Sequence, residues 1–273
     1  MKKKLTVLDI RNMKKNNRHF SMVTSYDYTS ASIVDSSNVE TILVGDSLGM
    51  VMLGYDSTIG VTMEDMIHYT KSVVAGAPHT FVVGDMPFGS YNKSIEDAIA
   101  NTTRMMKETG CDCVKLEGGK EFAPTIEAIV KSGTPVMAHL GLTCQTSSQL
   151  GGFKVQGKDK DGAIKLIEDI KAVVKAGAFS VVVECVPSQV GKMMQEAVDV
   201  PIIGIGAGKD VYGQVLVTQD MMGMYDKFTP KFVKKYANIR DIMINCYNQY
   251  DEECKEGQFP NKEQSFNVKI DDL

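Results

Sequence analysis

Short apolar segments alternate with amphipathic segments along most of this chain. Eight apolar segments rich in Val and Ile are predicted to be strands, namely residues 20–26, 40–47, 80–86, 113–118, 135–141, 180–185, 201–206 and 213–218. Apolar runs of this length are typical of strands that are buried on both faces of a parallel sheet.

The segments between these strands have the spacing of amphipathic helices. Ser94 begins an S-x-x-D capping pattern and Gly110 is a stop signal, so a helix is predicted between them. Apolar residues also recur at helical spacing over 121–132 and 161–176, and a glycine follows shortly after each of these segments.

Strands that alternate with helices indicate βαβ units and a parallel sheet. Eight such units favour a single-domain (β/α)8 TIM barrel over residues 1–273, with a doubly wound open sheet as the alternative. Residues 229–273 are predicted to form a C-terminal helix, over about 230–255, and a polar tail. The link between the last two strands, residues 207–212, is too short for a full helix. We therefore expect either an irregular barrel there or a misplaced strand.

Two long segments lack any periodicity. Residues 48–61 follow the second predicted strand, and residues 141–160 follow the fifth. Because long loops in compact domains are usually functional, we expect both to cover a site.

Composition and charge exclude several classes of function. The 273 residues carry 30 basic and 34 acidic side chains, with no basic patch, so a nucleic-acid partner is not expected. No apolar run reaches the roughly 18 residues of a membrane span, and the apolar stretch after Lys4 is too short for a signal peptide. Six cysteines without a C-x-x-C pair predict reduced thiols and a cytoplasmic location.

Ionisable side chains end five of the predicted strands. They are Asp46, Asp85, Glu117, His139 and Glu184. In a parallel α/β barrel the carboxyl ends of the strands meet on one face, where active sites are built. Buried carboxylates are costly unless they are paired or bind a metal. The pattern therefore predicts one shared site.

Three of these acids, Asp46, Asp85 and Glu117, come from consecutive strands. Carboxylate oxygens are ligands that suit Mg²⁺, with water and substrate completing the coordination. The alternative is that each acid caps the helix that follows it. Because three acidic strand ends occur in a row, two of them as V-G-D, we favour a metal site.

Lys115 lies two residues before Glu117, so the two side chains share a face of their strand. A buried lysine needs an anion, which a substrate carboxylate or oxyanion would supply. An internal ion pair between Lys115 and Glu117 is the alternative.

Glu184 is the candidate base, because it shares a face with Val182 and an apolar neighbourhood would favour that role. The alternative is a carboxylate that only pairs with an inward-facing base. His139 is predicted to orient a substrate oxygen or to share in proton transfer, unless it is a core histidine. Ser47 and Tyr26 lie beside this cluster in the sequence and could bind a substrate by hydrogen bonds.

No nucleotide-binding or esterase motif is present. Residues 204–208, GIGAG, are neither a G-x-G-x-x-G fingerprint nor a phosphate-binding loop, and no G-x-S-x-G elbow occurs.

The motifs around the acidic strand ends resemble the ketopantoate hydroxymethyltransferase family. The matching stretches are MVTSYD (22–27), VGDSLGMVMLGYDST (44–58), GDMPFGSY (84–91), VKLEGG (114–119), AHLGLTCQ (138–145), VVVECVP (181–187), IGIGAG (203–208) and GQVLV (213–217). The resemblance covers nearly the whole chain in order.

This resemblance implies a Mg²⁺-binding (β/α)8 barrel that assembles as a homodecamer in pantothenate synthesis. It implies transfer of a one-carbon unit from 5,10-methylenetetrahydrofolate to 3-methyl-2-oxobutanoate, which gives 2-dehydropantoate. By motif, Asp46 and Asp85 would bind the metal and Glu117 would join its shell. Ser47 would contact the keto acid together with Asp46, Asp85 and Lys115, and Glu184 would be the base.

The chain departs from the family pattern outside these site residues. Cys144 and Gly60 stand where the family usually has proline, Gln219 and Gln264 where it often has histidine, and Tyr212 where it more often has an acidic or small residue. These departures concern loop rigidity and the folate contacts.

Two competing functions stay open. One is another Mg²⁺ barrel enzyme acting on 2-oxo acids, such as a relative of phosphoenolpyruvate mutase or isocitrate lyase. Such enzymes use a cysteine in a loop, and Cys144 lies in the loop after the fifth predicted strand. The other is a non-catalytic protein that binds a keto acid or a metal.

Overall fold

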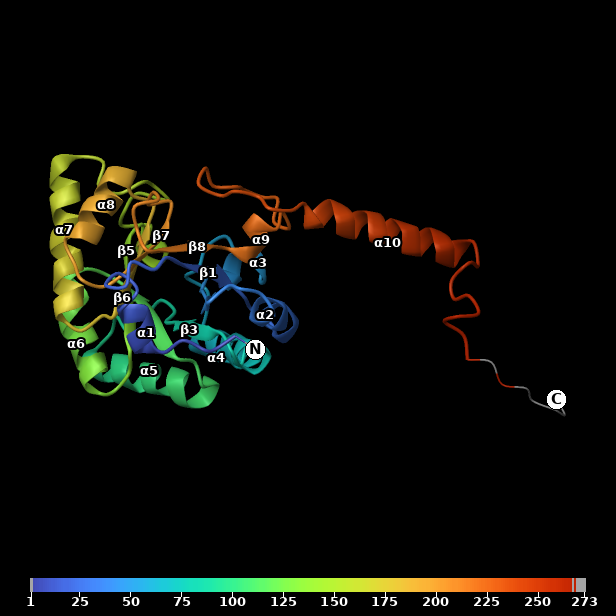
Figure 1. Ribbon diagram of the computed structural model, residues 1–273, viewed down its shortest axis with the longest axis horizontal. Coiled ribbons are helices and arrows are strands. Elements are labelled where there is room, and N and C mark those ends of the chain that lie inside the picture. Colours follow the sequence, from blue (N-terminus) through green and yellow to red (C-terminus); the bar gives the residue numbers. More distant parts are fainter. Residues whose placement is uncertain (1, 267, 269–273) are drawn as a thin grey trace. The chain divides into compact units, whose positions relative to one another are not determined.

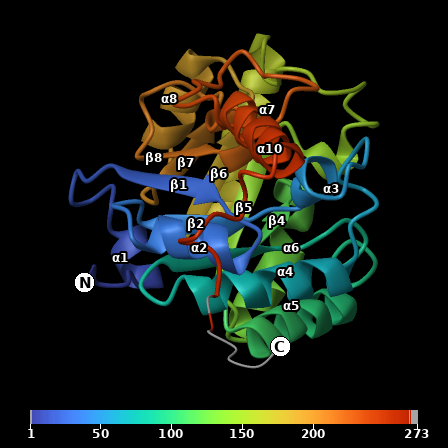
Figure 2. The ribbon, with the colours of Figure 1, turned by 90° about the vertical axis from the view of Figure 1, so that its right-hand side faces the viewer.

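Eight parallel strands form a closed barrel in chain order, and β8 pairs with β1 (Figures 1 and 2). The computed structural model describes residues 2–266 and 268. The strands are β1 (Phe20–Thr24), β2 (Thr41–Val44), β3 (Phe81–Asp85), β4 (Cys113–Glu117), β5 (Val136–Gly141), β6 (Ser180–Glu184), β7 (Ile202–Ile205) and β8 (Gly213–Leu216). Each lies within its predicted segment. The prediction of a (β/α)8 TIM barrel is confirmed, and the open-sheet alternative is wrong.

Helices follow most of the strands. They are α1 (Val7–Arg11), α2 (Tyr28–Asp35), α3 (Leu48–Val51), α4 (Met63–Gly76), α5 (Ile95–Thr109), α6 (Ala123–Lys131), α7 (Lys160–Lys175), α8 (Ser188–Glu196), α9 (Thr218–Met221) and α10 (Ile239–Lys255), with 3₁₀ turns η1 (Lys120–Phe122) and η2 (Cys144–Thr146). Within residues 1–218, the helices between the strands, such as α4, α5 and α7, lie on the outside of the barrel (Figure 2). The predicted capping is confirmed for α5. The Ser94 hydroxyl accepts from the amide of Asp97, and Gly110 ends the helix at φ 74°.

Alternate residues of the strands belong to two different apolar clusters. One set, which includes Leu43, Val83 and Met137, fills the barrel interior together with Ile10 and Met13 from the N-terminal segment. The other set packs against the helices, and Val44, Val82, Val114, Ala138 and Val183 are among its members. Both faces of each strand are therefore buried, which explains why the strands appear in the sequence as continuous apolar runs.

The link between β7 and β8 contains no helix among the residues that the structure describes. Gly206 and Gly208 take positive φ angles of 65° and 87°, which turn the chain back within a few residues. The predicted irregularity at this point is confirmed, and both strands were placed correctly.

The chain divides into two compact units, which we describe separately. The first contains residues 1–218 and 231–233, and the second contains 219–230 and 234–273. The predicted C-terminal helix is present in the second unit as α10, although it begins at Ile239 rather than near residue 230. Across the described part of the chain, no helix has both the length and the apolar character needed to span a membrane.

Candidate active site

The predicted site residues lie at the carboxyl ends of neighbouring strands. Asp85, Glu117 and Glu184 are the last residues of β3, β4 and β6. His139 lies opposite Glu117 in the β4–β5 register, and Asp46 follows β2 after one residue. A continuous chain of contacts joins all five, so the structure brings them together as one cluster.

Lys115 forms a buried ion pair with Asp85. Its Nζ lies 2.7 Å from Asp85 Oδ1, and both side chains are at most 4% exposed. The same Nζ lies 3.3 Å from His139 Nδ1. Burial alone lowers the pKa of Lys115, but the charges of Asp85, Glu117 and Asp46 outweigh burial and raise it. Lys115 is therefore charged and inward-facing, as predicted, although its salt-bridge partner is Asp85 and not Glu117.

Asp46 and Asp85 are adjacent buried acids. The Asp46 backbone amide donates to Asp85 Oδ2 at 3.1 Å. Burial, and then the charge of Asp85, raise the pKa of Asp46; burial also raises the pKa of Asp85, although Lys115 opposes that effect. Neither acid caps a helix, because the N-cap positions of α3 and α5 are Ser47 and Ser94. The capping alternative is therefore wrong for these two residues.

The imidazole of His139 bridges two carboxylates. Nδ1 lies 3.2 Å from Glu117 Oε1, and Nε2 lies 3.3 Å from Glu184 Oε2. Burial and Lys115 lower the pKa of His139, but its interactions with the two glutamates outweigh both effects and raise it to about 9. Burial alone would raise the pKa of Glu117, yet the hydrogen bond and charge of His139 lower it. At neutral pH the imidazole is therefore a cation that links both acids.

Glu184 has polar neighbours rather than the apolar neighbourhood expected from the sequence. Besides His139, it accepts a hydrogen bond from the Cys144 thiol, whose Sγ lies 3.6 Å from Oε1. Burial, and then the charge of Glu184, raise the pKa of Cys144, so the thiol stays protonated and can donate. The next residue, Cys185, has a positive φ of 49°, a strained conformation that often occurs at functional sites.

Ser47 lies beside Asp46, and its Oγ is 2.8 Å from the hydroxyl of Tyr26. Tyr26 is fully buried, and this contact fixes where the serine side chain points. Both residues therefore flank the acidic cluster, as the sequence predicted.

Two buried residues of the site were not predicted. Gln145 donates from its side-chain amide to Asp46 Oδ2 and accepts from the hydroxyl of Tyr91. Both residues lie in stretches that carry the family resemblance, which was the available signal. Gln145 shows that the η2 turn of the loop 141–160 lies against the site. That residues 48–61 also cover the site stays a prediction.

The acids fit a divalent cation only in part. No group of three or more His, Cys, Asp or Glu side chains within the described ranges is positioned to hold a metal ion. Both carboxylate oxygens of Glu117 face donors, His139 and the Gln145 amide. Asp85 likewise has Lys115 Nζ at one oxygen and the Asp46 amide at the other. Asp46 and Asp85 are nevertheless adjacent buried acids with raised pKa values, and a cation would relieve their repulsion. Mg²⁺ commonly uses one or two protein carboxylates with substrate and water.

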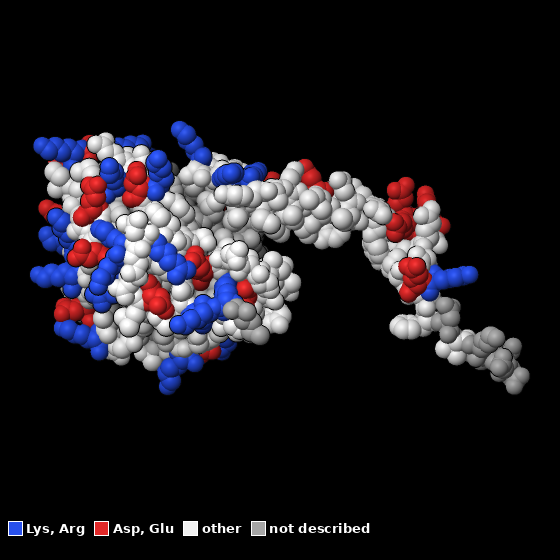
Figure 3. All heavy atoms as spheres, viewed as in Figure 1, with Lys and Arg blue, Asp and Glu red and all other residues white. Residues whose placement is uncertain are grey.

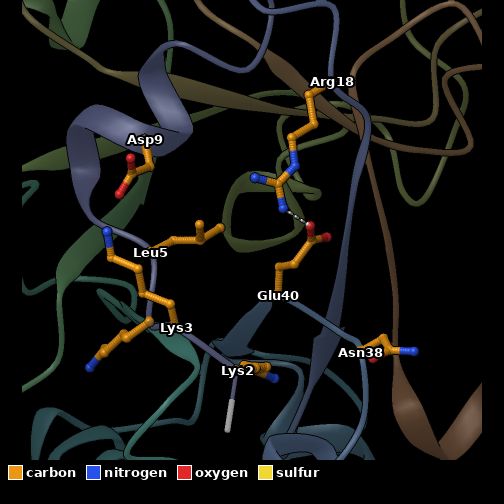
Figure 4. Close-up of a pocket in the computed structure, with 8 residues that line it drawn as sticks. Lys2, Lys3, Leu5, Asp9, Arg18, Asn38 and Glu40 are labelled. Carbon is orange, nitrogen blue, oxygen red and sulfur yellow. Dashed lines mark hydrogen bonds and ion pairs between the residues drawn. The ribbon is translucent and has the colours of Figure 1, made fainter.

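A separate surface pocket lies at the amino end of the barrel. Its volume is about 430 Å³, and it is lined by Lys2, Arg18 and Glu40 among others (Figure 4). Three of its basic residues are engaged: Arg18 pairs with Glu40 at 2.6 Å, Lys4 pairs with Asp112 at 2.9 Å, and Lys2 Nζ donates to backbone carbonyls. On the visible face of the first unit, basic and acidic side chains are interspersed (Figure 3).

The closed barrel and the buried acid, lysine and histidine cluster at its strand ends define a TIM-barrel enzyme. The sequence model of the ketopantoate hydroxymethyltransferases matches residues 4–262, and the chain belongs to this family. A 3-methyl-2-oxobutanoate hydroxymethyltransferase of Heliobacterium modesticaldum is 54% identical, covering 98% of this chain and 97% of that protein. The enzyme of the same name from Enterococcus faecalis is 52% identical, covering 99% of this chain and 98% of that protein. The resemblance noted in the sequence is confirmed.

Solved structures with the same barrel are more distant in sequence. A 2,3-dimethylmalate lyase, a member of the PEP mutase/isocitrate lyase superfamily, has a TM-score of 0.60 at 14% identity, covering 96% of this chain and 92% of that chain. A phosphonopyruvate hydrolase in complex with oxalate and Mg²⁺ has a TM-score of 0.60 at 10% identity, covering 97% and 93%. At these identities the likeness shows the fold alone.

Proposed function

We propose that this chain transfers a hydroxymethyl group to 3-methyl-2-oxobutanoate, giving 2-dehydropantoate, with 5,10-methylenetetrahydrofolate as the donor. The observation that carries the proposal is the family match over residues 4–262, which includes every residue of the buried cluster. The relatives named above carry the name of this reaction.

The cluster suits a small anionic keto acid. Asp46 and Asp85 would hold Mg²⁺, with Glu117 close by. The ion would supply positive charge near the ketone oxygen of the keto acid. Negative charge develops on that oxygen when the C3 proton leaves. Lys115 is a buried cation that can face the substrate carboxylate, and the Ser47 hydroxyl can donate a hydrogen bond to the keto acid.

Glu184 is the proposed base. Its carboxylate is held by His139 and Cys144 at the end of β6, and it would take the proton from C3 of the keto acid. His139 would hold that glutamate in place, so the proposal gives His139 a binding and positioning role.

The carbon–carbon bond then forms between C3 and the methylene carbon of the folate. The two bonds from the methylene carbon to the folate nitrogens break, and water supplies the hydroxyl group on that carbon. The two nitrogens take up two protons, one that came from C3 and one from water, and tetrahydrofolate leaves. The loop 141–160 would keep bulk water from the reactive carbanion, because its η2 turn already contacts Glu117, Glu184 and Asp46.

Exchange of the C3 proton for deuterium tests this proposal. Purified protein, Mg²⁺ and 3-methyl-2-oxobutanoate in deuterium oxide are followed by NMR, with a chelator control, and methylenetetrahydrofolate is then added. We expect metal-dependent loss of the C3 proton signal, followed by 2-dehydropantoate. Absence of both would overturn the proposal. Turnover of oxaloacetate, isocitrate or phosphonopyruvate would then support the alternative 2-oxo-acid enzymes.

We also propose that the enzyme is a cytoplasmic homo-oligomer, and a homodecamer by family analogy. The second unit supports an assembly, since Tyr247 and Tyr250 of α10 are 63% and 56% exposed. The two tyrosines are three residues apart on one helix and so share a face, and exposed apolar surface of this kind commonly marks protein interfaces. Light scattering after size exclusion should give ten times the 29.9 kDa mass of one chain; a monomer would contradict the proposal.

A further inference from the structure

Gln145 is a buried polar residue on a loop. It is the second residue of η2 and only 1% exposed. Its side-chain nitrogen donates to Asp46 Oδ2 and to the carbonyl oxygen of Met86, both at 2.9 Å, and its backbone amide donates to Glu117 Oε2 at 3.1 Å. One residue of the loop after β5 thus contacts acids that follow β2 and end β4.

The orientation of the Gln145 amide is determined by its neighbours. The Met86 carbonyl can only accept, and the Asp46 carboxylate accepts when ionised, so the nitrogen must face both. The amide oxygen then faces Tyr91, whose hydroxyl donates to it at 2.7 Å. Tyr91 in turn accepts from the backbone amide of Glu117 at 3.2 Å. Both amide hydrogens of Gln145 and its oxygen therefore have partners.

We infer that Gln145 and Tyr91 are positioning residues for the keto acid and its metal. The Gln145 side chain holds the Asp46 carboxylate and its backbone amide holds the Glu117 carboxylate. Tyr91 holds the Gln145 amide and the Glu117 backbone, and so fastens the loop over the site. This inference rests on the proposed function. It assigns these two residues a role in substrate binding through other groups rather than in the bond-breaking steps.

The chemistry of the amide supports a positioning role. A lysine or arginine at this point would neutralise Asp46 and compete with a metal ion. A neutral amide fixes the direction of the carboxylate and leaves its negative charge available. Groups that orient metal ligands in this way typically contribute about 10- to 100-fold to affinity or activity.

The contacts also link the position of the η2 turn to the orientation of the carboxylates. The hydrogen bonds from Gln145 to Asp46 and Glu117 form only when η2 lies over the strand ends. The adjacent Cys144 thiol contacts Glu184 from the same turn. Movement of η2 away from the strand ends would therefore break its contacts with Asp46, Glu117 and Glu184 together.

The test uses Gln145→Met, which keeps the side-chain volume and removes the amide, and Tyr91→Phe, which removes one oxygen atom. Gln149→Met is the matched control, because Gln149 lies on the same loop but is exposed. Calorimetry measures binding of 3-methyl-2-oxobutanoate with Mg²⁺, deuterium exchange gives KM and the limiting rate, and thermal melting reports folding.

We expect Gln145→Met to weaken Mg²⁺-dependent binding about 10- to 100-fold and to raise KM more than it lowers the limiting exchange rate, because Glu184 keeps its own partners. Tyr91→Phe should also weaken Mg²⁺-dependent binding of the keto acid. Its effect should be smaller in a protein that already carries Gln145→Met, because the two residues belong to one hydrogen-bond network. Gln149→Met should bind as the wild type does.

The inference would be overturned if folded Gln145→Met bound the keto acid within about twofold of the wild type, which is the range of an ordinary surface change. In that case, deuterium exchange by the wild type would still uphold the proposed function. Equal losses in Gln149→Met and Gln145→Met would overturn it as well. If Gln145→Met does not fold, weaker binding by Tyr91→Phe supports the inference and unchanged binding overturns it. A wild-type protein that neither binds nor exchanges overturns the proposed function, and this inference with it.

Discussion

Lys115 Nζ lies 2.7 Å from Asp85 Oδ1, although each residue is almost completely buried in the mouth of the barrel. The two belong to adjacent strands and are direct partners in the β3–β4 register. The contact therefore follows from the pairing of two strands whose inward faces both carry a charge. The cluster at this end of the barrel contains two cations, Lys115 and His139, and four acids, Asp46, Asp85, Glu117 and Glu184. Acidic groups are in excess, which suits this end of the barrel to a further cation.

Replacing Asp85 by Ala should abolish Mg²⁺-dependent binding of the keto acid and lower the free energy of unfolding by about 3–5 kcal/mol, because Lys115 loses its buried partner. Calorimetry and urea denaturation measure the two effects. Asp97→Ala is the control, since it removes only an exposed pair with Lys93 and should cost at most about 1 kcal/mol. Unchanged binding by Asp85→Ala would contradict the metal assignment.

Glu184→Gln should retain keto-acid binding and slow C3 deuterium exchange by at least about 100-fold, because the amide keeps the shape but cannot take a proton. The same change at Glu196, exposed on α8, should leave exchange unaffected. Exchange at the wild-type rate in Glu184→Gln would show that another group is the base.

The stability of the metal-free protein should depend on His139 in alkaline solution. Its pKa is raised to about 9 in the folded state by Glu117 and Glu184, against burial and Lys115, compared with about 6.5 for a free histidine. The resulting stabilisation is complete below pH 6.5 and is lost as the pH rises through 9. Urea denaturation at several pH values should show the wild type losing its advantage over His139→Gln across this window.

A control for this pH dependence is His68→Gln, because His68 is exposed on α4. That variant should follow the wild type across the whole window. A constant difference between the wild type and His139→Gln from pH 6 to pH 10 would mean that the imidazole does not change its charge there.

Gly141→Ala should destabilise the fold by more than about 1 kcal/mol and slow C3 exchange. Gly141 has a φ of 92°, and a Cβ there would overlap the backbone carbonyl oxygen of Glu184. Gly133 offers a matched control, because it has a φ of 101° with open space around a Cβ. A cost in Gly141→Ala no greater than in Gly133→Ala would show that the contact with Glu184 is unimportant.

The positions of the strands could be predicted because burial on both faces makes each strand a continuous apolar run. The same local reasoning placed Ser94 and Gly110 at the two ends of α5, since caps act within one turn of the helix. It also identified the acids that end the strands. It did not identify α3, because a helix of four residues is too short to show a period.

Partner choice needed the tertiary structure. For Lys115 the sequence predicted a substrate anion, with an internal pair to Glu117 as the alternative, yet strand register brought Asp85 to it. An apolar neighbourhood was expected for Glu184, and the fold supplied His139 and Cys144 instead. Such contacts join residues that are distant along the chain, so no local pattern records them.

The sequence by itself thus determined the barrel, the family and the set of ionisable residues at the strand ends. Only the tertiary structure decided which of them touch, and it added Gln145 and Tyr91, which come from loops separated by 54 positions. The physical reason is that periodicity and capping arise from neighbours along the chain. The direction of a buried side chain is decided by hydrogen-bond partners that folding brings from other strands.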